Sequence, residues 1–213
     1  MLTLGYSPWG TGDTDTHFVK LFDKSVDARK EGFDNVSCFL LWGGTDINAS
    51  FYNEKPHPLN QMQSSKLSER DVWEWEALKE CKKRNIPVIG VCRGAQLLCA
   101  FNGGKLYQHV NGHKGSHVLV TMDGDEFVSN SCHHQMLDVD NTNHTLLAWT
   151  KQPHSTIYEG LSKVPDKEPE IVYFHDNMAL AIQGHPEWMN EESDFVDYCL
   201  HIVSEMISEE VCV

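Results

Sequence analysis

The chain has 213 residues, enough for one domain of ordinary size, and its 40% of hydrophobic residues can form a core. Its 17 basic and 31 acidic residues give a net charge of −14, which argues against a nucleic-acid partner or an anionic membrane surface. No apolar run approaches ~18 residues, and the first residues lack the pattern of a signal peptide. The seven cysteines contain no C-x-x-C pair, so we expect a protein of the reducing cytoplasm.

Strand and helix patterns alternate in the first half of the chain. We predict a short strand over residues 2–6, a helix over 16–30 and a buried parallel strand over 36–42. Ser68 and Asp71 resemble a helix N-cap, and helical spacing continues to Cys81. A strand over 86–91 then leads into a helix that ends at Gly103-Gly104. This alternation predicts a parallel sheet with helices on both faces.

The predicted elements become shorter and turn-bounded after about residue 105. Strands are expected over 118–122, 126–129, 145–150, 171–174 and 180–183. A last amphipathic helix is expected over 191–208. We therefore predict a single α/β domain over residues 1–213, with an open, mostly parallel sheet and a small antiparallel extension.

The stretch Gly90-Val91-Cys92-Arg93-Gly94 has the pattern of a nucleophile elbow. A sharp strand-to-helix turn would hold Cys92 on a strained backbone, and the flanking glycines would let other backbone pass close to it. The N–H groups and dipole of the new helix would favour thiolate over thiol and could bind an oxyanion. The competing interpretation is a buried cysteine between two glycines of a parallel strand.

A second motif, Gly184-His185-Pro186-Glu187, follows a predicted strand. Residues two apart in extended chain point the same way, so Glu187 can reach the His185 ring. A carboxylate on one ring nitrogen leaves the other nitrogen to take a proton from Cys92. These three residues would form a triad, whereas an isolated His-Pro-Glu would more simply be a turn.

A third motif, the loop Trp42 to Asn48, lies at the carboxyl end of the 36–42 strand, where open α/β sheets place ligand loops. Its paired glycines would let backbone amides face a bound atom. We predict that the amides of Gly44 and Arg93 form an oxyanion hole, each contributing about 3 kcal/mol. An ordinary tight turn is the alternative.

Four motifs in this order resemble the class I glutamine amidotransferases, and more narrowly the γ-glutamyl hydrolase branch that includes γ-glutamyl-γ-aminobutyrate hydrolases. They are Gly90 to Gln96, Gly103 to Gln108, His133 to Gln135 and Gly184 to Trp188. The Gly43-Gly44-Thr45-Asp46 loop resembles the glycine-glycine-x-aspartate loop of the hydrolase branch.

This resemblance implies a flavodoxin-like, three-layer fold and a triad of Cys92, His185 and Glu187. In such proteins the cysteine attacks a γ-glutamyl amide, and the resulting thioester is hydrolysed to release glutamate and an amine or ammonia, without a cofactor. The resemblance also implies that the glutamyl end of the substrate is bound by Gly43 of the glycine loop, by Gln96 and by the segment His134-Gln135-Met136.

Three functions stay open at this point. The protein could be a free-standing hydrolase of a small γ-glutamyl compound, a glutaminase subunit that passes ammonia to a separate synthetase, or a binding protein of the same fold. The leaving amine depends on loops such as residues 48–66, which the sequence does not define, and the oligomeric state is equally undefined. The short segment before Val36 also leaves the sheet with room for fewer strands, so an edge strand could be missing.

Several histidines could suggest a metal site. His109, His113 and His117 have the four-residue spacing that aligns ligands on a helix, but two glycines interrupt it and the residues that follow have a strand pattern. His133 and His134 are interpreted as pocket lining. We therefore predict no metal site.

Overall fold

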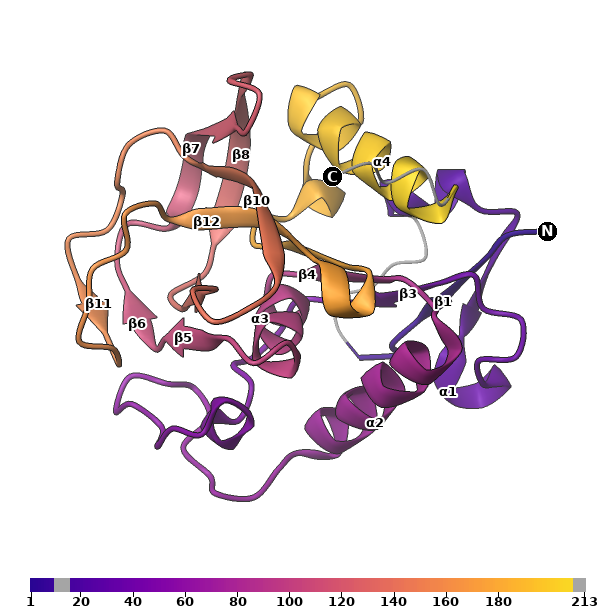
Figure 1. The fold of residues 1–213 in the computed structure, drawn as a ribbon, viewed down its shortest axis with the longest axis horizontal. Helices are drawn as coiled ribbons and strands as arrows, with labels where there is room; N and C mark the ends of the chain where they lie inside the picture. Colours follow the sequence, from indigo (N-terminus) through magenta and orange to yellow (C-terminus); the bar gives the residue numbers. More distant parts are fainter. Residues whose placement is uncertain (10–15, 209–213) are drawn as a thin grey trace.

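The computed structural model describes residues 1–9 and 16–208, and within them nine strands form one mixed sheet (Figure 1). The parallel part has the order β2 (Lys24–Asp27), β1 (Thr3–Tyr6), β3 (Cys38–Leu41), β4 (Val88–Val91) and β13 (Ala179–Ile182). The antiparallel part continues from β13 with β12 (Pro169–Phe174), β10 (His144–Thr150), β7 (Lys114–Thr121) and β8 (Glu126–Cys132). The predicted fold class is confirmed, and its antiparallel part supplies four of these nine strands.

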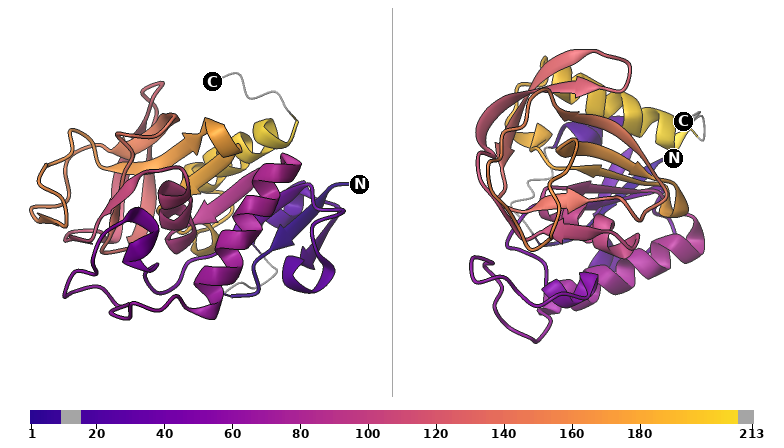
Figure 2. Two further views of the ribbon diagram at one scale, coloured as in Figure 1. Left: turned by 60° about the horizontal axis from the view of Figure 1, so that its bottom comes forward. Right: turned by 60° about the vertical axis from the view of Figure 1, so that its left-hand side comes forward.

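Helices cover both faces of the sheet. The helices α2 (Glu69–Arg84) and α3 (Arg93–Phe101) lie on one face, and α4 (Asp194–Ile207) lies on the other with the short 3-10 helix η1 (His17–Leu21) (Figures 1 and 2). The side chains of β4 alternate between these layers: Val88 packs under α2 and α3, whereas Ile89 packs under α4. The central strands β3, β4 and β13 are therefore buried on both faces, which explains their continuous apolar runs.

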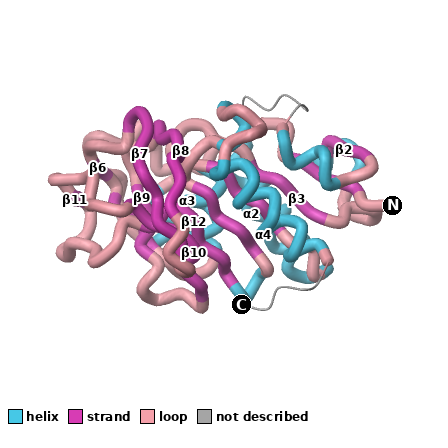
Figure 3. The backbone as a smooth tube through the Cα atoms, turned by 90° about the horizontal axis from the view of Figure 1, so that it is seen from above, coloured by secondary structure: helices cyan, strands magenta, loops and turns pink. Residues whose placement is uncertain are grey.

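Small elements complete the fold beyond the sheet. Two short pairs, β5 (Lys105–Tyr107) with β9 (Met136–Asp138) and β6 (His109–Val110) with β11 (Tyr158–Glu159), were not predicted. Figure 3 shows β6 and β11 at the end of the molecule away from the N-terminus. The remaining helical turns are α1 (Ala28–Glu31), η2 (Ala49–Tyr52), η3 (His175–Asn177) and η4 (Pro186–Trp188).

The helix predicted over residues 16–30 is wrong. The segment forms η1, then strand β2, then the single turn α1. Phe18 is buried under α4, while Lys24 to Asp27 pair in parallel with β1, and this pairing outweighs a weak local helix propensity. Strand β2 ends one side of the sheet, so the edge strand that seemed to be missing comes from this segment.

The other predicted helices are confirmed, as is the one predicted N-cap, at Ser68 and Asp71. Ser68 and Asp71 form a complete capping box at the start of α2, and Ser193 caps α4. Six cysteines lie in the described residues and none of them is paired, whereas Cys212 lies outside the described residues. Within the described residues, every helix is too short or too polar to span a membrane.

Candidate active site

The strained turn predicted at Cys92 is confirmed. Cys92 lies between β4 and α3 with φ 50° and ψ −104°, a conformation that non-glycine residues rarely adopt. Its N–H donates to the Ile182 carbonyl at 2.7 Å, which ties the turn to β13. A Cβ on Gly90 would lie 2.6 Å from the carbonyl carbon of Gly94, and one on Gly94 would lie 2.6 Å from the Leu41 oxygen. Both glycines are therefore required by close backbone packing.

The Cys92 thiol is largely buried, at 7% exposure. Burial raises the pKa of this thiol to about 12. The Arg93 N–H lowers the pKa by donating to the sulfur, whereas the negative charge of Glu187 raises it further. The expectation that the helix N-terminus favours a thiolate is therefore wrong, because burial outweighs the amide. A nucleophilic Cys92 needs a base that takes its proton.

His185 is held in one orientation from three sides. Its Nδ1 lies 2.8 Å from Glu187 Oε1, and because a carboxylate only accepts, Nδ1 carries the proton and Nε2 is free to act as a base. Asn130 exchanges two 2.8 Å hydrogen bonds with the His185 backbone. The Trp188 ring stacks on the imidazole with centroids 3.7 Å apart.

Gly43 lies between the cysteine and the histidine. A Cβ built on Gly43 would lie 2.9 Å from His185 Cε1 and 3.6 Å from Cys92 Cβ. The side chains of Cys92 and His185 therefore both lie next to Gly43. Cys92 comes from the β4–α3 turn, and His185 comes from the segment between β13 and η4. This position has no room for a side chain larger than glycine.

The glycine loop is held by Arg70, a residue that the sequence analysis missed. Arg70 donates to the Trp42 carbonyl at 2.8 Å and to the Gly43 carbonyl at 3.1 Å. The described peptide bonds are all trans, so the Gly44 N–H points opposite to the Gly43 carbonyl and away from Arg70. No sequence pattern marks Arg70, because both of its partners in the loop are backbone oxygens.

The Arg93 side chain joins α3 to α2. Its guanidinium lies 2.5 Å from Asp71 and also pairs with Glu74, and all three groups are buried. Glu74 additionally accepts from Ser7 at 2.6 Å and from Arg70 at 2.9 Å. Burial and the charge of Arg93 lower the pKa of Arg70. The start of α3 and the glycine loop are thus fixed by one buried network.

The predicted substrate-binding residues occupy different environments. Gln96 donates to the Gln135 carbonyl at 3.4 Å, and the buried Gln135 Oε1 has no partner. His134 Nε2 lies 2.9 Å from Asp46, whose charge also acts on Cys92. Met136 is fully buried in β9 and belongs to a small apolar cluster. His134 and Gln135 therefore offer polar atoms, whereas the Met136 side chain offers packing.

The described residues also contain a group of potential metal ligands, His113, His133 and Glu170, which lie on or beside the antiparallel strands. His109, which shares the four-residue spacing with His113, is not in this group and stacks on His57 instead.

The sheet order and its flanking helices define a class I glutamine amidotransferase-like fold. A glutamine amidotransferase from Thermotoga maritima has the same fold, with a TM-score of 0.61, 15% identity and coverage of 99% of this chain and 98% of that one. The chain belongs to the Peptidase C26 family, whose model matches residues 19–187.

Two relatives match this chain over different lengths. A Mycobacterium tuberculosis protein named as a candidate glutamine amidotransferase is 34% identical over 181 residues, which cover 79% of this chain and 57% of that protein. A γ-glutamyl-CDP-amidate hydrolase of Campylobacter jejuni is 32% identical over 98 residues, which cover 46% of this chain and 42% of that protein. The chain thus matches little more than half the length of the M. tuberculosis relative.

Proposed function

We propose that the protein is a cysteine hydrolase that cleaves the amide bond of a small γ-glutamyl compound. The observation that carries this proposal is the geometry at Gly43. The side chains of Cys92 and His185 both lie beside this glycine, and Glu187 binds the opposite side of the imidazole. A thiol, a base and a carboxylate in this order are the groups that nucleophilic amide hydrolysis requires.

In the first half of the reaction, His185 Nε2 takes the thiol proton as Cys92 Sγ attacks the γ-carbonyl carbon of the substrate. The carbonyl oxygen becomes an oxyanion, which the N–H groups of Arg93 and Gly44 would stabilise. The Arg93 amide already donates to the Cys92 sulfur, which supports its place beside the reacting carbon. When the C–N bond breaks, His185 gives the proton to the leaving amine and a γ-glutamyl thioester remains.

In the second half, His185 takes a proton from water, and the resulting nucleophile attacks the thioester carbon. The C–S bond breaks, Cys92 regains a proton and glutamate leaves. The Glu187 carboxylate, 2.8 Å from Nδ1, would stabilise the imidazolium in both halves of the cycle.

The glutamyl end of the substrate would be held by polar groups around the elbow. We assign Gly43, Gln96, His134 and Gln135 to this end, and the packed Met136 would support them. The unpartnered Oε1 of Gln135 supports the assignment, because a buried acceptor with no partner is costly and an ammonium group would satisfy it.

A specific observation favours a second function, a glutaminase that supplies ammonia to a separate synthetase. The M. tuberculosis relative named as a candidate glutamine amidotransferase covers 79% of this chain. Both functions share the same chemistry up to the thioester, so the preferred leaving group and the effect of a partner distinguish them.

The test is glutamate release from glutamine, several γ-glutamyl amines and γ-glutamyl-CDP-amidate, the compound in the name of the C. jejuni relative. We expect Cys92→Ala to lower turnover at least ~10³-fold, the scale of losing a covalent nucleophile. Cys81→Ala is the matched control, because it removes a buried thiol of α2 and leaves the elbow intact. Circular dichroism of each variant checks that it folds.

Preference for a γ-glutamyl amine or amidate over glutamine would support the free-standing hydrolase. Slow turnover of glutamine alone would support the glutaminase. Equal turnover by Cys92→Ala and wild type, or no glutamate from any of these compounds, would contradict both and favour a binding protein of this fold.

A further inference from the structure

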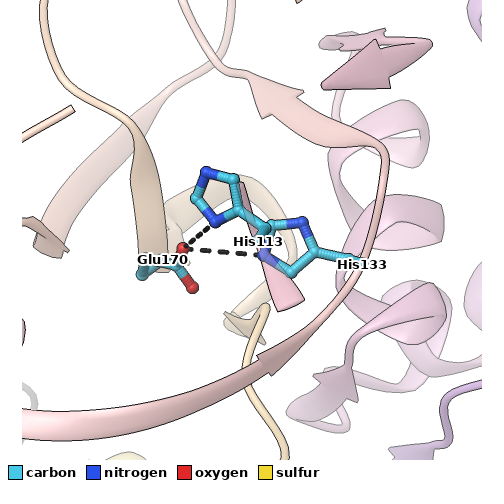
Figure 4. Close-up of side chains that lie close together, drawn as sticks. All are labelled: His113, His133 and Glu170. Atoms are coloured by element: carbon cyan, nitrogen blue, oxygen red, sulfur yellow. Dashed lines mark ion pairs between the residues drawn. The ribbon is translucent and has the colours of Figure 1, made fainter. Parts of the chain in front are cut away.

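We propose that His113, His133 and Glu170 form a binding site for a divalent transition metal ion, with Zn²⁺ as the expected occupant. The three residues come from the antiparallel part of the sheet: His113 directly precedes β7, His133 directly follows β8, and Glu170 lies in β12. The β7–β8 register brings the two histidines together, since the His133 N–H donates to the His113 carbonyl at 3.1 Å. Figure 4 shows both rings beside the Glu170 carboxylate.

The spacing of the ligand atoms fits a metal ion. Glu170 Oε1 lies 3.1 Å from His113 Nδ1 and 3.6 Å from His133 Nε2. Tetrahedral zinc with bonds of about 2.1 Å keeps its ligand atoms roughly 3.4 Å apart, and the observed distances lie on either side of that value. Two imidazole nitrogens and a carboxylate oxygen are ligands that Zn²⁺ accepts.

The ligand residues are buried, and several of their polar atoms have no hydrogen-bond partner among the described residues. Glu170 and His113 are completely buried and His133 is 4% exposed. Both ring nitrogens of His113, Nε2 of His133 and Oε2 of Glu170 have no hydrogen-bond partner. Buried polar atoms are normally satisfied, and here the ring nitrogens face carboxylate oxygens at 3.1, 3.4 and 3.6 Å without forming a hydrogen bond, an arrangement that a bound cation would satisfy.

Neighbouring groups orient the histidines as metal ligands require. His133 Nδ1 lies 2.9 Å from the Gln135 carbonyl, which can only accept, so Nδ1 carries the proton and the lone pair of Nε2 faces Glu170. His113 Nε2 lies 3.4 Å from the Glu168 carboxylate, which leaves Nδ1 for the metal.

The charge of the cluster also favours a cation. Glu168 and Glu170 are both buried, and in the described residues their ion-pair partners are histidines alone. Two carboxylates, neutral histidines and one divalent ion sum to zero charge. Glu168 also accepts hydrogen bonds from Thr150, Tyr158 and two backbone N–H groups, whereas the described residues offer Glu170 histidine partners, so Glu170 is the carboxylate that a cation would neutralise.

A route for the ion leads through His117. This residue hydrogen-bonds Glu170 Oε1 at 3.1 Å through Nε2 and, with His154, lines a surface cavity of about 370 Å³. We assign His117 as the residue that orients the Glu170 carboxylate, and we assign the fourth coordination position to water from this cavity. His133 also precedes His134 and Gln135, to which we assign the glutamyl end of the substrate, so the metal would anchor that segment; this last consequence rests on the proposed function.

The test measures the metal directly. The protein is purified with a histidine-free tag and stripped of metal with a chelator. One sample is titrated with Zn²⁺ in competition with a chromophoric zinc chelator. A second sample is titrated with Co²⁺ while the visible spectrum is recorded. We expect about one Zn²⁺ per chain and the intense visible bands of four-coordinate Co²⁺. His133→Gln and Glu170→Gln should weaken Zn²⁺ binding at least ~100-fold, and His117→Gln by ~10-fold, the scale of losing an orienting partner.

His201→Gln is the matched control, because His201 is an exposed histidine of α4 outside the cluster. Equal Zn²⁺ affinity in wild type, Glu170→Gln and His201→Gln, or the pale spectrum of hydrated Co²⁺ in wild type, would overturn the proposal and leave an ion-pair cluster. If a ligand variant fails to fold, the wild-type stoichiometry and Co²⁺ spectrum decide. None of these readouts depends on hydrolytic activity.

Discussion

Arg70 shows how a single side chain can hold the glycine loop that we propose to form part of the oxyanion hole. Its guanidinium binds the carbonyls of Trp42 and Gly43, and Glu74 holds it from behind. A peptide whose carbonyl is bound on one side presents its N–H on the other, so Arg70 determines the direction of the Gly44 amide. This is a positioning role, since Arg70 touches the loop and not the thiol.

We predict that Arg70→Gln lowers kcat about 10- to 100-fold, with a smaller change in KM, because a misdirected donor weakens binding of the oxyanion more than binding of the substrate. Steady-state kinetics on the best γ-glutamyl substrate measures both constants. Arg84→Gln is the control, because Arg84 lies on the same helix and pairs with Glu80 and Asp34 on the surface. An unchanged kcat in Arg70→Gln would show that the loop keeps its orientation unaided.

At the scale of elements, the elbow depends on the approach of α3 to β4. Gly90 lies in β4 and Gly94 in the first turn of α3, and their backbones leave no volume for a methyl group between them. The buried pairs of Arg93 with α2 hold the same helix end from the other side.

We expect Gly90→Ala to destabilise the protein by roughly 1–3 kcal/mol, because its methyl group would meet backbone atoms of Gly94 that cannot rotate away. Urea denaturation measures the free energy of unfolding. Ser204→Ala, at an exposed position of α4, should change it by less than about 0.5 kcal/mol. A Gly90→Ala variant as stable as the control would mean that the elbow relaxes easily.

At the scale of the whole molecule, one sheet joins both halves of the chain. Strand β4 of the first half pairs with β13 of the second, and the strand order places β13 between the parallel and antiparallel parts. Two apolar layers, one on each face, contain residues from both halves. From this continuity of the described residues we propose that the chain forms a single domain.

A single domain should unfold in one transition. The buried thiols Cys81 and Cys199 lie in opposite halves of the chain. We expect both thiols to become accessible to labelling with the same urea midpoint, and the midpoint measured by tryptophan fluorescence to equal it. Chelator keeps the protein in one metal state during the measurement. Earlier labelling of one thiol than of the other would contradict the prediction, because it would show that the two halves unfold separately.

The sequence by itself determined the features whose signals are local. The strand run before Gly90, the capping box of Ser68 and Asp71, and the two-residue spacing of His185 and Glu187 each depend on near neighbours, and the structure contains all three arrangements. Only the tertiary structure decided that residues 24–27 form an edge strand, that burial raises the pKa of Cys92, and that Arg70 holds the glycine loop. The grouping of His113, His133 and Glu170 is of the same kind. These features depend on which distant segments meet in the folded chain, and such contacts leave no periodic pattern in the sequence.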